Sequence, residues 1–306
     1  MNRWIGHIGA LFVMFVWGAT FVNSKILLTN GLLPDEIFFL RSVQAYIILA
    51  LFSHKHWLAR SWRDELIFLG LGIFGGSLYF LCENTALVYG STANVSILVG
   101  STPLLTALLI GSIYKSERLN SLQCFGSVIA FIGMVLVILN GQLILRLNPL
   151  GDTLALCASA TWAVYSLLIR FVSDKYNTIF VTRKVFFYGL LTIIPVLLFS
   201  HKASFDYTLL AKPVIFGNLL FLGVLASSIC YLIWNKVLKL IGTIRATNYI
   251  YMQSIVTMFT AKIVLDERIT WMAILGVVVL ISGLILVQRK PLPTSLTGEE
   301  QEECNS

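Results

Sequence analysis

Charged residues are scarce in this chain of 306 residues. Asp, Glu, Lys and Arg make up only 12% of it, whereas a soluble globular protein carries about 25%. Hydrophobic residues make up 57% of the sequence. A chain with so little polar side-chain surface cannot face water on every side, because large exposed apolar patches drive association. Most of its surface is therefore expected to face membrane lipids.

Histidine and cysteine are also few, which disfavours a metal site or a disulfide framework. The four histidines lie at the ends of apolar segments or between them. The five cysteines form no close pair, and most lie in apolar segments, where a free thiol behaves as a small hydrophobe; they are Cys82, Cys124, Cys157, Cys230 and Cys304. We expect no metal and no cofactor.

Two further motifs are absent. The sequence has no nucleotide-binding loop of the form G-x-x-x-x-G-K-[ST], so a pump driven by ATP is disfavoured. The net charge is +7, but the basic residues are scattered over short loops instead of forming a stripe interleaved with aromatic residues. Nucleic acid is therefore not an expected partner.

Ten apolar segments are long enough to cross a bilayer as helices of about 20 residues. Strands are excluded, because these runs are too long and do not alternate as a membrane barrel requires. The first segment is longer than the core of a signal peptide, so we interpret it as a membrane helix. The predicted spans are 6–28, 35–53, 65–87, 92–114, 121–140, 150–171, 178–199, 213–236, 244–265 and 270–288.

The basic residues predict the orientation of these spans. With a cytoplasmic N-terminus, fifteen Lys and Arg residues fall on the cytoplasmic side and four on the outer side. Such a bias is typical of cytoplasmic loops. We therefore expect a multi-pass protein of the plasma membrane with both termini in the cytoplasm. Residues 289–306 are polar and are predicted to form a disordered cytoplasmic tail.

The sequence also repeats itself. Residues 37–43 resemble residues 179–185, and Trp17 and Lys25 correspond to Trp162 and Arg170. We assign one five-helix repeat to 6–140 and a second to 150–288. Because five is odd, the second repeat must enter the membrane from the opposite side, which gives two inverted halves. This architecture is typical of secondary transporters that work by alternating access.

Specific motifs resemble the drug/metabolite transporter superfamily, in particular its EamA-type carriers. They are Trp17-Gly18-Ala19-Thr20-Phe21, Ala93-Asn94, Pro103 and the Glu-Arg pairs at 117–118 and 267–268. The resemblance covers residues 6 to 288. It implies export or exchange of small metabolites or amphipathic compounds, an efflux function without ATP hydrolysis. The chain departs from the pattern at Ser254, where many second halves carry Pro, and at Glu83-Asn84, where a small apolar pair is more usual.

Polar and aromatic residues within the spans are the candidates for a substrate cavity, because each is costly in lipid unless it has a partner or meets water. Spans five and ten are almost purely apolar, so they are expected to brace the bundle from outside. The alternative for each polar residue is an interhelical hydrogen bond of about 0.6 kcal/mol. The predicted substrate-binding residues are Trp17, Asn23, Tyr79, Asn94, Thr102, Trp162, Tyr165, Tyr231, Asn248 and Gln253.

Three charged residues lie well inside the spans of the first half, away from their first residues. Counting ~1.5 Å per residue along a helix places Lys25, Arg41 and Glu83 at a similar depth, in the outer third of the bilayer. Isolated charges are expensive there, so we expect them to pair with one another. The pair either holds the helices together or opens during transport, with Glu83 taking a proton or releasing a cation to an anionic substrate. Pro103, near the middle of span four, is expected to kink that helix.

Two other functions are weighed against a transporter of small molecules. A membrane-embedded enzyme acting on lipid needs converging nucleophile, base or metal ligands, and the interiors of the spans contain no histidine and no carboxylate cluster. A non-transporting scaffold is harder to separate from a carrier by sequence.

Overall fold

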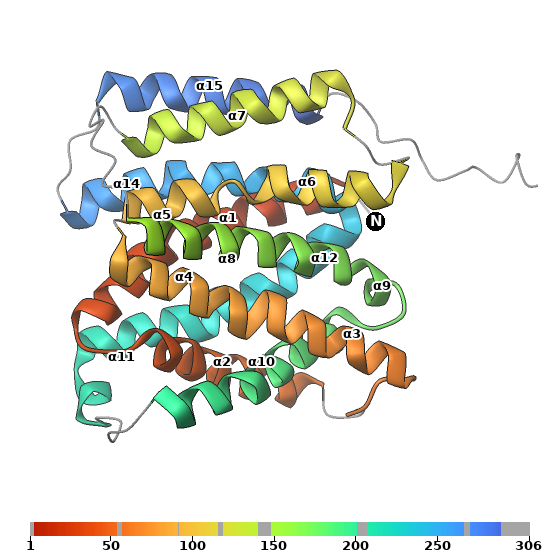
Figure 1. Ribbon diagram of the computed structural model, residues 1–306, viewed down its shortest axis with the longest axis vertical. Helices are drawn as coiled ribbons and strands as arrows, with labels where there is room; N and C mark the ends of the chain where they lie inside the picture. Colours follow the sequence, from red (N-terminus) through yellow and green to blue (C-terminus); the bar gives the residue numbers. More distant parts are fainter. Residues whose placement is uncertain are drawn as a thin grey trace, which may run out of the picture.

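The structure is a computed structural model that describes residues 3–53, 57–90, 92–115, 119–139, 148–200, 207–265 and 270–288. Within these ranges the regular elements are all helical, and most of them run in the same direction or its reverse across a single bundle (Figure 1). The Glu-Arg motifs at 117–118 and 267–268 and the tail 289–306 lie outside the described residues.

The first half corresponds to predicted spans one to five. Its elements are α1 (Arg3–Thr29), α2 (Pro34–Phe52), α3 (Trp62–Gly72), η1 (Ile73–Ser77), α4 (Leu78–Tyr89), α5 (Thr92–Val99), α6 (Thr102–Ile113) and α7 (Ser121–Leu139). The π-helical segment η1 joins α3 to α4, so these three elements form one span. The fourth span is broken between α5 and α6.

The second half repeats this plan. Its elements are α8 (Pro149–Leu168), α9 (Arg170–Ser173), α10 (Thr178–Ser200), η3 (Tyr207–Ala211), α11 (Pro213–Leu220), η4 (Phe221–Ile229), α12 (Cys230–Ile241), α13 (Thr243–Asn248), η5 (Tyr249–Met252), α14 (Gln253–Leu265) and α15 (Trp271–Gln288). The eighth span again contains a π-helical segment, η4. The ninth span is again interrupted, here by the 3-10 turn η5.

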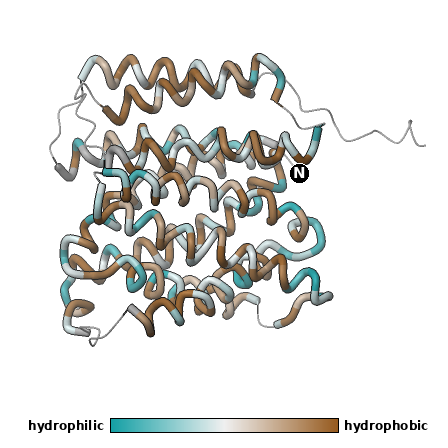
Figure 2. The backbone as a smooth tube through the Cα atoms, viewed as in Figure 1, coloured by the Kyte–Doolittle hydropathy of each residue, from teal (hydrophilic) through white to brown (hydrophobic). Residues whose placement is uncertain are grey.

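The bundle is a membrane protein with ten membrane helices. Seven helical segments of the described residues are long and apolar enough to cross a bilayer. The helix α2 has three charged residues, Asp35, Glu36 and Arg41, among its 19 residues. Apolar residues dominate the helices (Figure 2), and large side chains such as Leu108 and Ile263 are exposed to the surroundings. The predicted fold class is confirmed.

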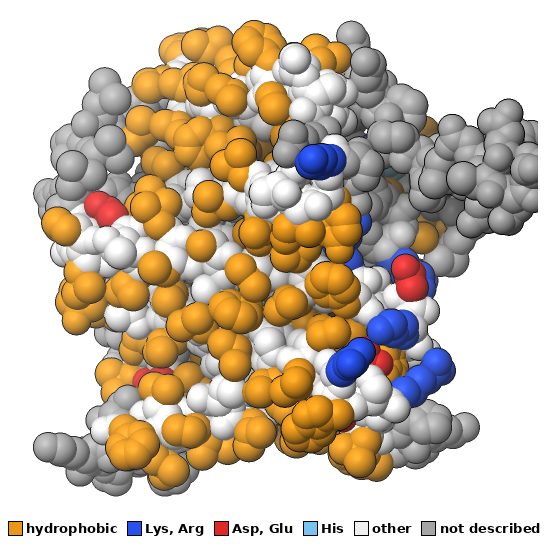
Figure 3. All heavy atoms as spheres, turned by 45° about the vertical axis from the view of Figure 1, so that its right-hand side comes forward, with side chains coloured by type: hydrophobic (Ala, Val, Ile, Leu, Met, Phe, Trp, Pro, Cys, Tyr) orange, Lys and Arg blue, Asp and Glu red, His pale blue; other side chains and the backbone are white. Residues whose placement is uncertain are grey.

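The two ends of the bundle differ in charge. The start of α1 and the end of α15 lie at the same end (Figure 1). Hydrophobic side chains cover most of the face drawn in Figure 3, whereas Lys and Arg side chains gather towards one end. Exposed basic residues of the described chain include Arg60, Arg63, Lys175 and Lys239. Because the start of α1 and the end of α15 lie at the same end of the bundle, the chain crosses it an even number of times.

Prolines begin four of the helices. Pro34, Pro103, Pro149 and Pro213 each occupy the first turn of a helix, where the missing N–H costs nothing because it has no intrahelical acceptor. The interruption expected at Pro103 falls in the turn just before it, where proline removes the hydrogen bond to residue i−4. The chain breaks at Gly100 and Ser101, and Pro103 starts the second half-helix.

The helices α7 and α15 pack along each other at one side of the bundle (Figure 1). A Cβ atom on Gly133 would lie 2.3 Å from the backbone N of Leu280, and a Cβ atom on Gly283 would lie 2.3 Å from the backbone N of Ala130. Real atoms do not approach so closely. Only glycine therefore allows the two backbones to come this near, as in other small-residue interfaces between membrane helices.

The glycines of this α7–α15 interface also reveal the symmetry of the halves. Gly126 approaches the carbonyl O of Gly283, and Gly133 approaches the carbonyl O of Gly276. Gly126 and Gly276 are 150 positions apart, as are Gly133 and Gly283. Exchanging the halves therefore converts one contact into the other. That is the property of a two-fold axis between antiparallel helices, as inverted repeats require.

We predict that Gly283→Ala destabilises the protein by about 1–3 kcal/mol, the usual cost of overpacking, because the new methyl group meets the backbone of α7. The matched control is Gly217→Ala in α11, where nothing lies within 4 Å of the added Cβ atom. Alanine there is expected to be neutral or stabilising, since it favours the helix. Thermal unfolding of the purified protein in detergent measures both. Equal midpoints for the two variants would contradict the close α7–α15 contact.

Candidate functional site

A cavity lies inside the bundle, between the two halves. It holds about 430 Å³ of empty space, which includes the open space at its mouth. It reaches the interruptions of the fourth and ninth spans. Its lining consists of Trp17, Thr20, Arg41, Tyr79, Phe80, Glu83, Val99, Thr102, Trp162, Tyr231, Ile250 and Gln253.

Eight of the lining residues form four pairs, one member from each half. The pairs are Trp17 with Trp162, Tyr79 with Tyr231, Val99 with Ile250 and Thr102 with Gln253, each 145 to 152 positions apart. The cavity thus lies where equivalent parts of the two repeats meet. The other four residues, Thr20, Arg41, Phe80 and Glu83, all come from the first half.

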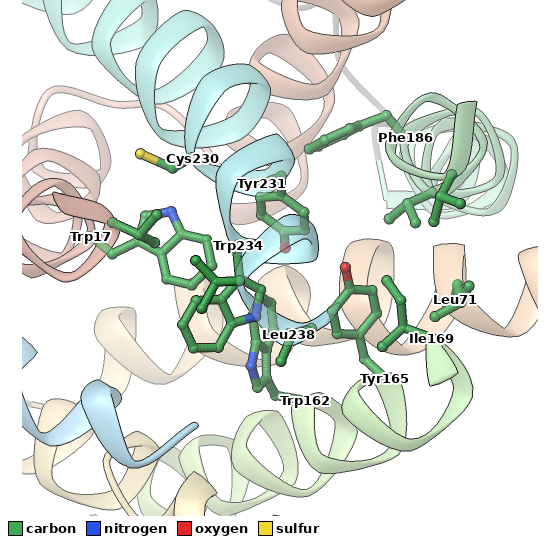
Figure 4. Packing of buried hydrophobic residues seen from close by; sticks show 14 of the residues in the cluster. Trp17, Leu71, Trp162, Tyr165, Ile169, Phe186, Cys230, Tyr231, Trp234 and Leu238 are labelled. Atoms are coloured by element: carbon green, nitrogen blue, oxygen red, sulfur yellow. The ribbon is translucent and has the colours of Figure 1, made fainter. Parts of the chain in front are cut away.

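Aromatic rings form much of the cavity wall. Trp17 of α1 and Trp162 of α8 meet edge to face with their ring centres 5.4 Å apart. Tyr231 of α12 lies 5.6 Å from Trp17 and 5.7 Å from Trp162, and Tyr79 lies 4.9 Å from Trp162. Figure 4 shows Trp17, Trp162 and Tyr231 converging from three helices. Such edge-to-face pairs are the preferred arrangement of aromatic rings, so the wall is held firmly.

Both π-helical segments supply backbone acceptors to this wall. A π-helical turn shifts the backbone hydrogen bonds by one residue, which leaves a carbonyl available. The hydroxyl of Tyr231 donates to the carbonyl O of Gly75 in η1 at 2.7 Å. The indole N–H of Trp17 donates to the carbonyl O of Ala226 in η4 at 3.0 Å. Each half therefore fixes an aromatic residue of the other half.

Side chains at the two broken spans donate hydrogen bonds to backbone carbonyls. The hydroxyl of Thr102 donates to the carbonyl O of Val99 at 2.6 Å and lies 2.9 Å from the hydroxyl of Ser159. The amide of Gln253 donates to the carbonyl O of Trp17 at 3.1 Å. Because no water is available in lipid, the bond from Thr102 makes the interrupted backbone of the fourth span tolerable at this depth. The bond from Gln253 ties the ninth span to α1.

Two opposite charges face the cavity. Arg41 of α2 and Glu83 of α4 are both buried, with 2% and 7% of their surfaces exposed. The Nε atom of Arg41 donates to the hydroxyl of Ser227 at 2.8 Å, and its guanidinium lies 4.2 Å from the centre of the Phe80 ring. Glu83 accepts a hydrogen bond from the hydroxyl of Tyr79 at 3.1 Å. The two charges interact electrostatically, but among the described ion pairs none joins them.

Eight predicted residues therefore lie together in the cavity lining. They are Trp17, Arg41, Tyr79, Glu83, Thr102, Trp162, Tyr231 and Gln253. The predicted pairing of three charges is not what the structure shows. Lys25 lies outside the lining, and its ammonium donates to the carbonyl O of Leu87 at 2.6 Å. Depth along a helix could be counted from the sequence, but the direction in which each side chain points could not.

Three other predicted residues form interhelical hydrogen bonds beside the lining. Asn23 donates to the side chain of Asn218 at 2.6 Å. Tyr165 donates to the side chain of Asn235 at 2.6 Å, behind Trp162. Asn248 donates to the carbonyl O of Ile244 and accepts from Ser127 of α7. The backbone of Asn94 belongs to α5, but its side chain lies outside the described residues.

Four lining residues were not predicted. Thr20 was visible within a motif but carried no distinguishing signal. Phe80, Val99 and Ile250 are apolar, so a search for polar residues in lipid passes over them. Val99 precedes the interruption of the fourth span, and Ile250 lies within that of the ninth. Among the described residues, no group of three or more His, Cys, Asp or Glu side chains is placed to hold a metal.

A second set of contacts joins the halves at the basic end of the bundle. The buried Lys184 of α10 donates to the carboxylate of Glu65 of α3 at 2.8 Å. The carboxylate of Asp64 accepts from Lys175 at 3.1 Å and from the hydroxyl of Tyr176 at 2.8 Å. Burial raises the pKa of Tyr176, so the phenol stays protonated and remains a donor at neutral pH. We call these five residues the end latch.

Comparison with known proteins agrees with this architecture. The sequence model of the EamA-like transporter family matches residues 4–139 and again residues 149–289. An uncharacterized transporter from Archaeoglobus fulgidus is 27% identical and covers 93% of this chain and 97% of its own. A probable amino-acid metabolite efflux pump from Escherichia coli K12 is also 27% identical, covering 90% of this chain and 92% of its own. One crystal structure shares the fold, with a TM-score of 0.73 at 14% identity over 92% of this chain and 97% of its own.

We predict which positions of the cavity water reaches. In a background without the five native cysteines, Cys at Thr20 or Gln253 is expected to react with a small charged thiol reagent, because both positions line the cavity. Cys at Asn248 is expected to stay unreacted, because that side chain is buried against α7. Val128 is 47% exposed on the outside of α7. Cys at this position is expected to stay unreacted, because lipid covers it. Equal labelling at all four positions would contradict the cavity.

Proposed function

The chain belongs to the EamA-like transporter family, and from this premise we propose that it exports small amino-acid metabolites across the plasma membrane by alternating access. Membership in the family confirms that the protein is a transporter and not a membrane enzyme. The class of substrate is supported by the description of its E. coli relative as a probable amino-acid metabolite efflux pump.

The position of the cavity supports alternating access. It lies where equivalent residues of two inverted halves meet, beside two broken spans and next to two π-helical segments. Discontinuous helices near the bilayer midplane are the usual site of substrate binding in secondary transporters. Rocking one half against the other moves these walls relative to each other and changes the side from which the cavity is reached.

The end latch is proposed to close the cytoplasmic side. It lies at the basic end of the bundle, which the bias of Lys and Arg assigns to the cytoplasm together with both termini. Its contacts run from α3 in the first half to α10 and the segment before it in the second half. A substrate entering from the cytoplasm therefore requires these contacts to separate. Each turnover would then break and re-form a buried ion pair.

We predict that cells lacking the protein retain metabolites that cells producing it release. An untargeted comparison of intracellular and external metabolites identifies the compounds and the direction of transport together. The compounds are expected to carry amino-acid chemistry, and Trp162→Ala is expected to reduce their release because it removes one cavity wall. Membrane levels of each variant are measured as the control. Accumulation of the same compounds inside producing cells would contradict export.

We also predict that locking the end latch stops transport. In the cysteine-free background, the pair Glu65→Cys and Lys184→Cys is expected to lose transport when a short bis-methanethiosulfonate reagent links the two thiols and to regain it on reduction, because the link joins the two halves. The matched control is Asp174→Cys with Lys239→Cys. This ion pair of 3.2 Å lies within the second half, so its cross-link is expected to leave transport intact. Undiminished transport by the cross-linked Glu65–Lys184 pair would show that the latch does not need to open.

A further inference from the structure

We propose that residues 57–63 bind the headgroup of an anionic phospholipid in the cytoplasmic leaflet, and that a lipid bound there holds the end latch closed. We call these residues, Trp57-Leu58-Ala59-Arg60-Ser61-Trp62-Arg63, the interfacial segment. It lies between α2 and α3 and includes the start of α3. The lipid site is independent of the proposed export, whereas its effect on the latch rests on the proposed closing of the cytoplasmic side.

The interfacial segment exposes large apolar side chains. Trp57 is 57% exposed, Leu58 is 77% exposed and Trp62 is 78% exposed. The segment lies between a span that ends at Phe52 and a span that begins at Trp62, which is the depth of the lipid headgroups. Tryptophan is enriched at this depth, because its ring meets apolar atoms while its N–H meets polar ones. These side chains therefore lie among lipids.

The same segment carries two exposed positive charges, Arg60 and Arg63. Among the ion pairs of the described residues, neither arginine takes part. The next two residues along the chain, Asp64 and Glu65, do not neutralise them, because both are bound to lysines of the second half. A guanidinium can bind two phosphate oxygens through parallel N–H groups. A phosphate group is therefore the fitting partner for the two arginines.

Charge and exposure together select an anionic phospholipid. The ammonium group of a zwitterionic headgroup compensates its own phosphate, whereas an anionic headgroup keeps a net negative charge for Arg60 and Arg63. The exposed rings of Trp57 and Trp62 lie in the same segment, so acyl chains attached to the phosphate gain apolar contacts that a soluble phosphate does not. Clustered basic residues beside a membrane helix recognise anionic lipids in this way. Lys and Arg side chains of the protein also gather at this end (Figure 3).

The backbone of the interfacial segment is held by the second half. The amide N of Arg60 donates to the hydroxyl of Tyr176 at 2.8 Å. The carbonyl O of Trp57 accepts from the ammonium of Lys184 at 3.2 Å, and the Trp57 ring centre lies 4.9 Å from the guanidinium of Arg183. Tyr176 and Lys184 are members of the end latch. The latch thus fixes the segment that displays the exposed arginines and tryptophans.

Lipid binding and latch closure are therefore coupled. With the latch closed, the amide N of Ala59 also donates to the carboxylate of Glu65 at 2.7 Å, the carboxylate that Lys184 binds. When the two halves separate, the segment loses Tyr176 and Lys184 as partners, and its side chains are no longer fixed together. A lipid that prefers the fixed segment shifts the equilibrium towards the closed latch. By the same coupling, the closed latch binds the lipid more tightly.

The repeat does not provide this site twice. The loop between spans seven and eight, residues 201–212, occupies the equivalent place on the outer side. It contains neither Trp nor Arg. The interfacial segment is therefore an addition to the two-fold plan, and it meets the cytoplasmic leaflet only.

The first test compares two lipids with identical acyl chains. Thermal unfolding of the full-length protein in a non-ionic detergent is measured with dioleoyl phosphatidylglycerol, which is anionic, and with dioleoyl phosphatidylcholine, which is zwitterionic. Phosphatidylglycerol at a tenfold excess over its dissociation constant is expected to raise the unfolding midpoint by about 3 °C or more. Phosphatidylcholine and inorganic phosphate are expected to leave it unchanged.

Variants assign the effect to the interfacial segment. The double variant Arg60→Gln with Arg63→Gln is expected to lose most of the shift caused by phosphatidylglycerol. The matched control, Lys236→Gln with Lys239→Gln, removes two exposed positive charges from α12 and is expected to keep the shift. Should the Gln variant fail to fold, Arg60→Lys with Arg63→Lys keeps both charges but not the planar guanidinium, and is expected to bind the lipid several-fold more weakly.

The second test reads the latch by hydrogen–deuterium exchange. The amides of Ala59 and Arg60 are donors in the contacts that hold the segment, so their exchange reports its release. Phosphatidylglycerol is expected to slow the exchange of a peptide covering residues 57–63, and phosphatidylcholine is not. Tyr176→Phe removes the acceptor of the Arg60 amide. It is expected to reduce both this protection and the affinity for phosphatidylglycerol, an effect that surface charge alone does not predict.

Three results would overturn the lipid site. They are equal shifts with the two lipids, an equal shift with inorganic phosphate, which would assign the segment to soluble anions, and a full shift in the double Arg variant. A shift without slower exchange of residues 57–63 would retain the site but reject its coupling to the latch. Undiminished transport by the cross-linked Glu65–Lys184 pair would instead reject the proposed closing of the cytoplasmic side, and would leave the lipid site standing.

Discussion

Lipid offers no hydrogen bonds, so each backbone group at membrane depth needs a partner within the protein. The interruptions in spans three, four, eight and nine release backbone carbonyls in the middle of the bundle. The wall residues of the cavity take up several of them, as Tyr231 does for Gly75 and Trp17 does for Ala226. The residues that shape the cavity are thus the same residues that make a discontinuous backbone stable there.

One part of the cavity lining follows the two-fold symmetry of the halves, and the other part does not. The aromatic and interruption-flanking residues come in pairs from both halves, as expected where inverted repeats exchange conformations. The charges do not, because Arg41 and Glu83 both belong to the first half. An exchange of the halves would therefore preserve the shape of the wall but move the charged pair relative to the two sides of the membrane.

Much of this architecture could be predicted, because bilayer thickness fixes the length of an apolar span and basic loops report its orientation. The interruption of the fourth span is marked in the sequence by Gly100 and Pro103, but the one at Tyr249–Met252 could not be predicted, because no Gly or Pro marks it. The types of residue in the site could be predicted from the sequence, but the direction in which each side chain points could not. Lys25 and Glu83 lie at similar depth, yet only Glu83 faces the cavity, and Asn248 looks as polar as Gln253 although it bonds to α7.

The glycines between α7 and α15 have a consequence for how each half behaves as a separate unit. Gly126 meets Gly283 and Gly133 meets Gly276, with equivalent residues on the two sides of the contact. A surface of this kind is isologous, because the same patch serves on both partners. A single five-helix half thus carries a self-complementary face, and two copies inserted in opposite orientations could assemble through it without any linker.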